Sequence, residues 1–391
     1  MRKEIKKVPT IRFRGFTEDW EQHKVSDIAG RYDNLRVPVS SNKRVHGTTP
    51  YYGANGVQDY VDGYTHDGEY ILIAEDGAND LQNYPVHYVN GRIWVNNHAH
   101  VLQGKTGIAD TKFLSYAFSQ IDISSLLVGG GRAKLNADVL MKLDLLLPEH
   151  KEQEKLGNYF SHIDSLIALH QRKLDQLKKL KKYFLQNMFP AKGEKVPRIR
   201  FKGFTGDWEQ RKLSEMVIRY EDPIVTPHDG YTRLGIRSHA KGTFYEYVAP
   251  GHELETAQMH RVAADKLIFN ITFAWEHAVA ITTKDDAGKL VSHRFPQFTL
   301  SESLRPEFLK YIILDEGFNH TLYLASPGGA GRNRVLKIDE ALDYPICFPS
   351  FEEQHKIGEF LNKLSNLITL HQRKLDQLQT MKKFMLQNMF I

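Results

Sequence analysis

Apolar side chains recur at every third or fourth position in two long stretches of the chain. One stretch carries Leu156, Phe160, Ile163, Ile167, Leu174 and Leu177, and the other carries Ile357, Leu361, Leu364, Ile368, Leu375 and Leu378. This spacing is that of a heptad seam and predicts two helices of roughly 35 to 40 residues. Because so long an apolar stripe is not stable in water, we expect the helices to pair antiparallel, with the residues from Phe160 and Leu361 onward forming the interface.

The stripe changes phase near the end of each stretch. Its expected continuation is Leu180, Phe184 and Met188 in the first stretch and Met381, Met385 and Met389 in the second. The same drift in both stretches indicates one helix design used twice.

The two stretches are copies of one sequence. Residues 170–177 read HQRKLDQL, and the same eight letters return at 371–378. The similarity extends from 148–189 to 349–390, where 23 of 42 positions are identical at an offset of 349 − 148 = 201. A coiled coil that only dimerises would also explain two similar helices, so the sequence between them decides the function.

A second repeated segment opens each half, and we call it the opening segment. Residues 8–28 match residues 196–216 at 14 of 21 positions, with an offset of 196 − 8 = 188. Its prolines and glycines predict an extended, turn-rich strip that docks through Phe13, Phe16 and Trp20. The chain is therefore a tandem duplication of opening segment, variable stretch and long helix.

The variable stretches, 29–147 and 217–348, have lost almost all resemblance to each other. Both contain short runs of Tyr, Ile, Val, Phe and Thr broken by Gly, Asn and Asp, which favours mixed sheets. Helices are expected at Lys112–Gln120 and Pro306–Leu314. The predicted fold is α+β, with two mixed α/β modules joined by two long antiparallel coiled-coil helices in a pseudo-twofold tandem repeat.

The expected division has four parts. A first module spans 1–147, the first helix 148–190, a second module with a short linker 191–348, and the second helix 349–391.

Each variable stretch closes on a glycine-rich basic loop. The first contains Arg132 and Lys134, and the second contains Arg332 and Arg334. Glycine permits close approach of the backbone to a polyanion, and arginine can bridge phosphates or contact guanine. A hairpin tip without any ligand is the other interpretation, and the sequence leaves both open.

Charge and composition add little. The net charge is +5 with an isoelectric point near 8.9, and the basic run at 172–182 is also typical of a solvated helix flank. One cysteine, Cys347, excludes an intramolecular disulfide and fits a cytoplasmic location. We expect neither an export signal nor a membrane-spanning stretch, because no apolar core follows the basic residues at the start and no run approaches eighteen apolar residues.

Catalytic and metal-binding motifs fail on inspection. Residues 103–106 resemble the end of a phosphate-binding loop, but position 99 is alanine where that motif needs glycine. His98 and His100 lie on one face of an expected strand without carboxylates in sequence to complete a metal site, which favours a hydrogen-bonding role. We expect no catalytic residue, no metal site and no cofactor bound by this chain.

The duplicated frame resembles the specificity subunits of type I restriction-modification systems. The resemblance covers essentially the whole chain. It rests on FRGFTEDWEQ and FKGFTGDWEQ in the opening segments, LPEHKEQEKLG and FPSFEEQHKIG at the helix starts, LHQRKLDQLKKLKKYFLQNMF in the helix, and YYGANG, IAEDGAN and WVNNHAH in the first module.

This resemblance implies that each module is a target-recognition domain that reads one half of a split, asymmetric site in double-stranded DNA. It also implies that the helices set the spacing, that two methyltransferase subunits dock on the repeated segments, and that motor-nuclease subunits complete the restricting complex. S-adenosylmethionine, ATP and Mg are then used by the partner subunits. A coiled-coil adaptor that binds proteins and no DNA is the alternative.

The residues expected at the DNA are polar or aromatic and lie in predicted loops. For base contact they are Tyr51, Tyr52, Asn55, Asn79 and Asn97 in the first module, and Arg233, Arg237, Asn270 and His277 in the second. Arg132, Lys134, Arg332 and Arg334 are expected to contact phosphate. Any of the tyrosines could instead belong to the core.

Overall fold

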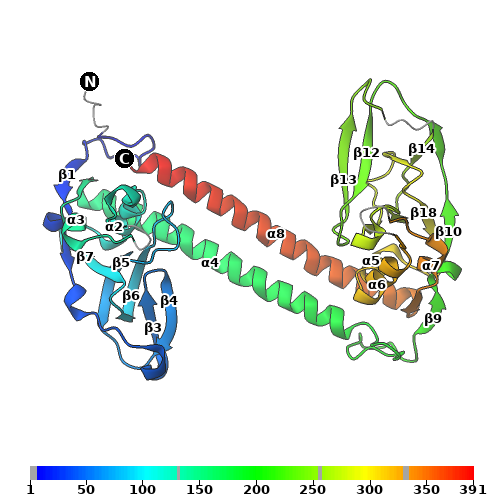
Figure 1. The fold of residues 1–391 in the computed structure, drawn as a ribbon, viewed down its shortest axis with the longest axis horizontal. Coiled ribbons are helices and arrows are strands. Elements are labelled where there is room, and N and C mark those ends of the chain that lie inside the picture. Colours follow the sequence, from blue (N-terminus) through cyan, green and yellow to red (C-terminus); the bar gives the residue numbers. More distant parts are fainter. Residues whose placement is uncertain (1–6, 130–132, 254–257, 329–333) are drawn as a thin grey trace. The chain divides into compact units, whose positions relative to one another are not determined.

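A computed structural model describes residues 7–391 apart from 130–132, 254–257 and 329–333 (Figure 1). The chain divides into two compact units. Unit 1 contains residues 1–173 and 371–391, and unit 2 contains residues 174–370. Each unit therefore combines one module with parts of both long helices, and the expected four-part division remains a prediction about domains.

Both predicted long helices are present. Helix α4 spans His150–Asn187 and helix α8 spans Phe351–Met389 (Figure 1). Neither is apolar enough to cross a bilayer, and the same holds for the other helices in the described ranges.

Within unit 1 the two helices run in opposite directions. Asp164 lies 2.5 Å from Lys382, and one helical turn or more further along α4, His170 lies 2.9 Å from His371. Advancing along α4 thus means going back along α8, which confirms the predicted antiparallel pairing in this unit. In unit 2 the rings of Phe184 and Phe360 meet at 4.8 Å.

The sheet of unit 1 has six strands in the described ranges, in the order β2-β7-β5-β6-β3-β4. They are β2 Ala29–Arg31, β7 Ala99–Gly104, β5 His66–Ala74, β6 Val86–Val95, β3 His46–Gly53 and β4 Gly56–Val61. All neighbours are antiparallel except β3 and β6, which are parallel. The strands are rich in β-branched and aromatic residues, as their sequence predicted.

One face of this sheet packs on helix α2 (Thr111–Phe118) and on the start of α4. The core there includes Ile71, Phe113 and Phe160, which are fully buried. The predicted helix at 112–120 is confirmed, with Asp110 as its cap, since the Asp110 carboxylate accepts a hydrogen bond from the Phe113 amide at 2.7 Å.

Unit 2 has a different architecture. Within the described residues it contains a four-stranded sheet, β10 Val217–Tyr220, β18 Gln297–Leu300, β15 Lys266–Phe269 and β16 Val279–Ile281. A second sheet has five strands, in the order β11 Pro223–Val225, β14 Gln258–Arg261, β17 Leu290–Ser292, β12 Tyr231–Ile236 and β13 Thr243–Val248. Helices α5 Pro306–Ile312 and α6 Glu316–Leu324 follow, and α5 confirms the second short helix predicted.

Each unit also contains a short strand pair that ties its opening segment to the base of a long helix. In unit 1, β1 (Glu21–Lys24) pairs with β8 (Asp144–Leu147), and α1 (Val25–Ile28) and α3 (Ala137–Met141) flank this pair. In unit 2, β9 (Glu209–Lys212) pairs with β19 (Pro345–Phe348), next to α7 (Ile338–Leu342). We call the opening segment, this strand pair, α2 or α5, and the long-helix base the frame of each unit.

A bidentate ion pair joins the opening segment to the long helix in both frames. In unit 1, Arg12 donates to both oxygens of Glu152 at 2.8 and 2.7 Å. In unit 2, Arg200 contacts Glu353 in the same way at 2.7 and 2.8 Å. Both carboxylates are buried, so each needs its guanidinium partner.

A glutamine one residue further clamps the short helix of each unit. The Gln153 amide accepts from the Asp110 backbone at 3.0 Å and donates to Pro148 at 2.9 Å. Gln354 accepts from the Arg305 backbone and donates to Pro349, both at 2.9 Å. The ion pair and the glutamine contacts are thus equivalent in the two frames.

The end of each long helix packs in the unit whose opening segment belongs to the other repeat. The ring of Phe390, just after α8, contacts Trp20 and Phe113 in unit 1 at 6.2 and 5.4 Å between centroids. In unit 2, Phe189 after α4 contacts Trp208 at 6.1 Å. The predicted docking role of Trp20 is confirmed, and its partner is the far end of the chain.

Candidate nucleic-acid interface

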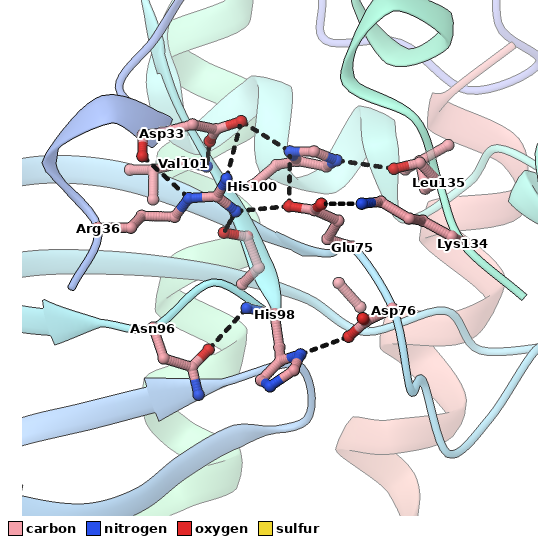
Figure 2. Close-up of polar contacts among 12 residues, drawn as sticks. Asp33, Arg36, Glu75, Asp76, Asn96, His98, His100, Val101, Lys134 and Leu135 are labelled. Carbon is pink, nitrogen blue, oxygen red and sulfur yellow. Dashed lines mark hydrogen bonds and ion pairs between the residues drawn. The ribbon is translucent and has the colours of Figure 1, made fainter. Parts of the chain in front are cut away.

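A charged network lies at the end of β5 in unit 1 and holds the base of the first glycine-rich loop (Figure 2). Glu75, directly after β5, contacts Arg36 at 2.6 Å and Lys134 at 2.7 Å. His100 on β7 bonds through Nδ1 to Asp33 at 2.8 Å and through Nε2 to the Leu135 carbonyl at 2.9 Å. Acidic and basic groups alternate, so the cluster carries little excess charge.

The same residues fix the backbone of that loop. The Leu135 amide donates to the Glu75 carbonyl at 2.8 Å, and Val128 and Lys134 exchange two backbone hydrogen bonds at 2.9 and 3.0 Å. Those two bonds join the two sides of the loop at its base. Lys134, expected at phosphate, has a half-exposed side chain that is paired with Glu75.

The electrostatics of the cluster keep both carboxylates charged. Burial acts to raise the pKa of Glu75, but hydrogen bonds from Lys134 and Arg36 outweigh burial and hold that pKa below its ordinary value. Burial likewise opposes ionisation of Asp33, whose pKa is lowered by hydrogen bonds from His100 and the Val101 amide. A charged cluster whose ion pairs neutralise one another thus supports the base of the loop.

The two histidines of the WVNNHAH motif both bond to carboxylates. Besides the His100 contact with Asp33, His98 Nδ1 lies 2.5 Å from Asp76 (Figure 2). No cluster of three or more histidine, cysteine or carboxylate side chains suited to a metal occurs in the described part of the chain. The predicted hydrogen-bonding role is thus what these contacts support.

Asn55 and Asn79, both expected at bases, are brought together. The Asn55 side chain accepts from the Asn79 amide at 2.9 Å and donates to the Gly77 carbonyl at 3.0 Å. Asn55 therefore links the β3–β4 turn to the loop that follows β5, and its amide is committed to that link. Asn79 is exposed, and its side chain makes no hydrogen bond within the described residues, so it stays a candidate contact.

The structure corrects the expectation that Tyr51 contacts a base. It is 1% exposed, and its hydroxyl is bonded to both the amide and the carbonyl of Val39, at 3.0 and 3.2 Å. A ring in that position is core and has no free polar atom for a base. Tyr52 is half-buried against a small core cluster below the sheet, and Asn97 is exposed.

In unit 2 the expected arginines of β12 are tied to its neighbour β13. Arg233 pairs with Glu246, and Arg237 donates to the Thr243 carbonyl while lying 5.3 Å from the Phe244 ring. Arg237 is exposed and Arg233 is partly exposed. They stay candidates, although neither is free of a protein partner.

The structure also corrects the expectation that Asn270 and His277 contact bases. Asn270 is 9% exposed, and its side-chain oxygen accepts from the amide and hydroxyl of Thr272 at 3.2 and 2.8 Å. His277 is 7% exposed and bonds through Nε2 to the Ile313 carbonyl at 2.6 Å. Both side chains shape the loop after β15 and are turned away from solvent, which argues against base contact.

The second glycine-rich loop ends on a basic and aromatic group. Arg334 lies 4.6 Å over the Tyr323 ring and 5.6 Å from the Trp275 ring. Beyond it, the Leu336 amide donates to the Ile271 carbonyl at 2.8 Å, as Leu135 does to Glu75 in unit 1. In both units, the residue that follows the glycine-rich loop is therefore bonded to the segment just after a sheet strand. Arg132 and Arg332 lie outside the described residues.

Most of the predicted helix-interface residues are buried. Phe160, Ile163, Leu174, Leu177, Leu361, Leu364, Leu375 and Leu378 are buried, and Ile167 and Ile368 are half-buried. The expected continuation of the stripe was wrong at Leu180 and Met381, which are 41% and 37% exposed. Met188 and Met389 do reach the cores, because each helix end is clasped by the opening segment of its unit.

Sequence reasoning missed the residues that hold the interface in place. Glu75 lies about forty positions from Asp33 and Arg36, and no sequence spacing links it to them. Gln153 and Gln354 had a signal, since both repeats retain glutamine at this position amid variable neighbours.

The duplicated frame matches a known family twice. The model described as "Type I restriction modification DNA specificity domain" matches residues 17–179 and again residues 206–380. The chain belongs to this family. The two matches place one specificity domain on each repeat, which confirms the recognition-module assignment at the level of the family.

Similar proteins of this family come from distant organisms. A putative type I restriction enzyme specificity subunit of Haemophilus influenzae is 39% identical over 155 residues, which are 40% of this chain and 39% of that protein. The type I restriction enzyme MjaVIII specificity subunit of Methanocaldococcus jannaschii is 22% identical over 94% of this chain and 91% of its own length.

A solved structure extends the likeness to the fold. The S subunit of the type I restriction-modification system from M. genitalium superposes with a TM-score of 0.69 at 11% identity, over 98% of this chain and 99% of that one. At this identity the likeness shows the fold alone.

Proposed function

We propose that this specificity-family chain reads a bipartite, asymmetric DNA site, with unit 1 reading one half and unit 2 the other. The observation that carries the proposal is the contrast between equivalent frames and unlike sheets within the described residues. Two different half-sites require two different reading surfaces, while a common mounting requires the same frame twice. Direct readout then comes from side chains at base edges and orientation from phosphate contacts.

The long helices in this proposal act as a spacer. Helix α4 is 38 residues long, and its two parts belong to different units. At 1.5 Å per residue such a helix measures roughly 57 Å, ample for separating two reading surfaces by one DNA turn of roughly 34–36 Å.

Partner docking is proposed for the exposed apolar residues that the two helices share. Tyr183 is 52% exposed and its counterpart Phe384 is 53% exposed, with Leu180 and Met381 one turn earlier. Both copies keep these positions apolar although neither is buried in the helix pair. Their duplication suits two identical methyltransferase subunits. A groove of about 510 Å³ is lined by Met381, Phe384 and three neighbours on α8.

Catalysis in this proposal belongs to the partners. The methyltransferase subunits transfer a methyl group from S-adenosylmethionine to adenine, and motor-nuclease subunits use ATP and Mg when present. The chain itself supplies recognition and assembly.

The test is replacement of residues 29–134 by the corresponding segment of another family member, followed by co-expression with the cognate methyltransferase subunit. Sequencing of methylated adenines is expected to show a bipartite motif for the native chain and a change in only one half for the hybrid. Residues 108–118 keep the sequence of this chain in the hybrid, because α2 belongs to the frame and both the Asp110 amide and the Ile108 carbonyl bond to Gln153, so the frame contacts are retained. A motif that changes in both halves would contradict independent reading.

The spacer is tested separately by adding seven residues after His170 and seven after His371. The heptad keeps the apolar face in phase, and the units move apart by roughly 10.5 Å. The gap between half-sites should grow by up to about three base pairs, since the rise per base pair is about 3.4 Å. As a control, two added residues in each helix turn the seam by roughly 200° and should abolish methylation. An active heptad variant with an unchanged gap would contradict the spacer.

A further inference from the structure

A polar pocket of about 310 Å³ opens on unit 1 near the turn that precedes β7. Its lining includes Arg44, Tyr51, Gln58, Asn97 and His98. The volume is at the small end of ligand pockets, which span about 300–1,000 Å³, and suits a single heterocycle. Tyr51 lies on β3, Gln58 on β4, Arg44 just before β3, and Asn97 and His98 in the 96–98 turn, so the pocket lies outside the frame.

The floor of the pocket is rigid. The Arg44 guanidinium lies 4.0 Å over the Tyr51 ring and donates to the Val39 carbonyl at 3.1 Å. Its remaining charge is paired with Asp59 at 3.2 Å. Because this cation is neutralised inside the protein, the pocket does not present the free positive charge that a phosphate would need.

The rim carries hydrogen-bonding groups without protein partners. Gln58 and Asn97 are exposed, and neither side chain makes a hydrogen bond within the part of the chain that is described. The Gln58 amide lies across Gly53, where an added Cβ would meet its nitrogen at 2.1 Å, so Gly53 leaves the amide room. Each amide offers both a donor and an acceptor.

His98 completes the rim in a fixed orientation. Its backbone amide donates to the buried Asn96 side chain at 2.8 Å, and its Nδ1 is held by Asp76 at 2.5 Å (Figure 2). The Nε2 atom has no hydrogen-bond partner in the described residues. Asp76 is therefore a positioning residue that leaves Nε2 available to a ligand.

We propose that this pocket receives the hydrogen-bonding edge of one nucleobase in the half-site read by unit 1, with Gln58, Asn97 and His98 as specificity-determining residues. The inference rests on the proposed function and names where unit 1 reads sequence. Paired amides are complementary to the donor and acceptor edge of adenine, which asparagine and glutamine contact through N6 and N7. Of the three residues, only Asn97 was expected from the sequence.

The experiment compares Gln58→Ala, Asn97→Ala and His98→Ala in the full chain, each co-expressed with the methyltransferase subunit. Methylome sequencing is expected to show one base position of the unit 1 half-site relaxed by about tenfold to a hundredfold in discrimination. The unit 2 half-site and the gap should be unchanged. Asn90→Ala is the matched control, because Asn90 is an exposed asparagine on β6 that does not line the pocket.

A positioning variant separates base reading from folding. Asp76→Asn keeps the shape of the side chain but weakens the hold on His98, and it should relax the same base position as His98→Ala with unchanged melting temperature. If the native chain gives no bipartite motif, the proposed function fails. If the native motif is bipartite and all three alanine variants keep it equally sharp, the pocket assignment alone is overturned.

Discussion

Unit 1 and unit 2 have the same frame and different sheets. Unit 1 forms one six-stranded sheet in its described residues, whereas unit 2 forms sheets of four and five strands. Yet Arg12–Glu152 and Arg200–Glu353 repeat the same bidentate geometry. The difference teaches that assembly and recognition place separate demands on the sequence. In the proposed function, the frame contacts repeat because they hold identical partners, and the sheets differ because they read different half-sites.

The frames themselves differ at one informative position. Arg200 also donates to the Gly206 carbonyl at 2.6 Å, whereas Nη1 of Arg12 is buried without a hydrogen bond. Gly206 has a φ of 81°, a left-handed backbone conformation that glycine adopts without strain. The equivalent residue in unit 1 is Glu18. The ion pair of unit 1 thus depends more heavily on its carboxylate.

The largest effect we predict is loss of that carboxylate. Glu152→Gln should cost about 3–5 kcal/mol of folding free energy, because it leaves a poorly satisfied guanidinium at a buried site. Glu353→Gln should cost less, because Arg200 keeps its two backbone acceptors. Hydrogen exchange of amides in β5 measures the stability of unit 1, and exchange in β15 measures that of unit 2. Equal losses in both units would show that the Gly206 contact contributes nothing.

A smaller effect is expected from filling the close approach at the helix base. An added Cβ at Gly157 would lie 2.9 Å from the Phe113 amide nitrogen, and at Gly358 it would lie 3.0 Å from the Glu307 carbonyl. Overpacking costs about 1–3 kcal/mol and the helical gain of alanine offsets about 1, so each Gly→Ala variant should lose roughly 1 kcal/mol. Thermal melting of the two variants beside the native chain measures this loss, and a gain in stability would contradict the tight fit.

Acidification should sharpen the comparison between the sheets. Burial lowers the pKa of His66 and His87 in unit 1 and of His277 in unit 2. Because the folded state favours the neutral form of these histidines, their contribution to the folding free energy is complete above the unfolded pKa of about 6.5. It is lost as the pH falls toward the folded pKa, since the unfolded chain then binds protons first. Each histidine lowers the stability of its unit by at most about 1.4 kcal/mol per pH unit, and unit 1 should lose more stability because it contains two of the three.

Exchange measurements at pH 7 and pH 5.5 check this expectation. His277→Asn is the matched variant, since asparagine tolerates the left-handed backbone at a φ of 63° and does not titrate. The variant should flatten the pH response of unit 2 only. An unchanged response would mean that another group in unit 2 is responsible.

The smallest stability effect is expected on the exposed helix faces. Tyr183→Glu and Phe384→Glu should each change the folding free energy by less than about 0.5 kcal/mol, because both side chains are half-exposed. Each should nevertheless remove one methyltransferase subunit from the assembly, since a charge would be buried against the partner. Mass measurement of the complex distinguishes one docked subunit from two. Complexes that keep both subunits in the two variants would contradict docking at these sites.

The sequence by itself determined the frame. Heptad spacing, the repeated octet and the repeated opening segments sufficed for the long helices and the duplication, because helix periodicity and tandem copies are local patterns. The short helices α2 and α5 followed from local helix-start signals. Side-chain placement within the strands was beyond that reasoning, and this is why Tyr51, Asn270 and His277 looked like contacts.

Only the tertiary structure decided which polar residues face solvent and which hold loops. Tyr51 and Asn97 are both polar residues in strand-rich sequence, yet the first is sealed beneath Arg44 and the second stands at the rim of a pocket. The network around Glu75 joins residues more than thirty positions apart, as does the Trp20 contact with Phe390. Such partners are chosen by burial and by the hydrogen bonds that buried charges require, and both depend on segments that meet only after the chain has folded.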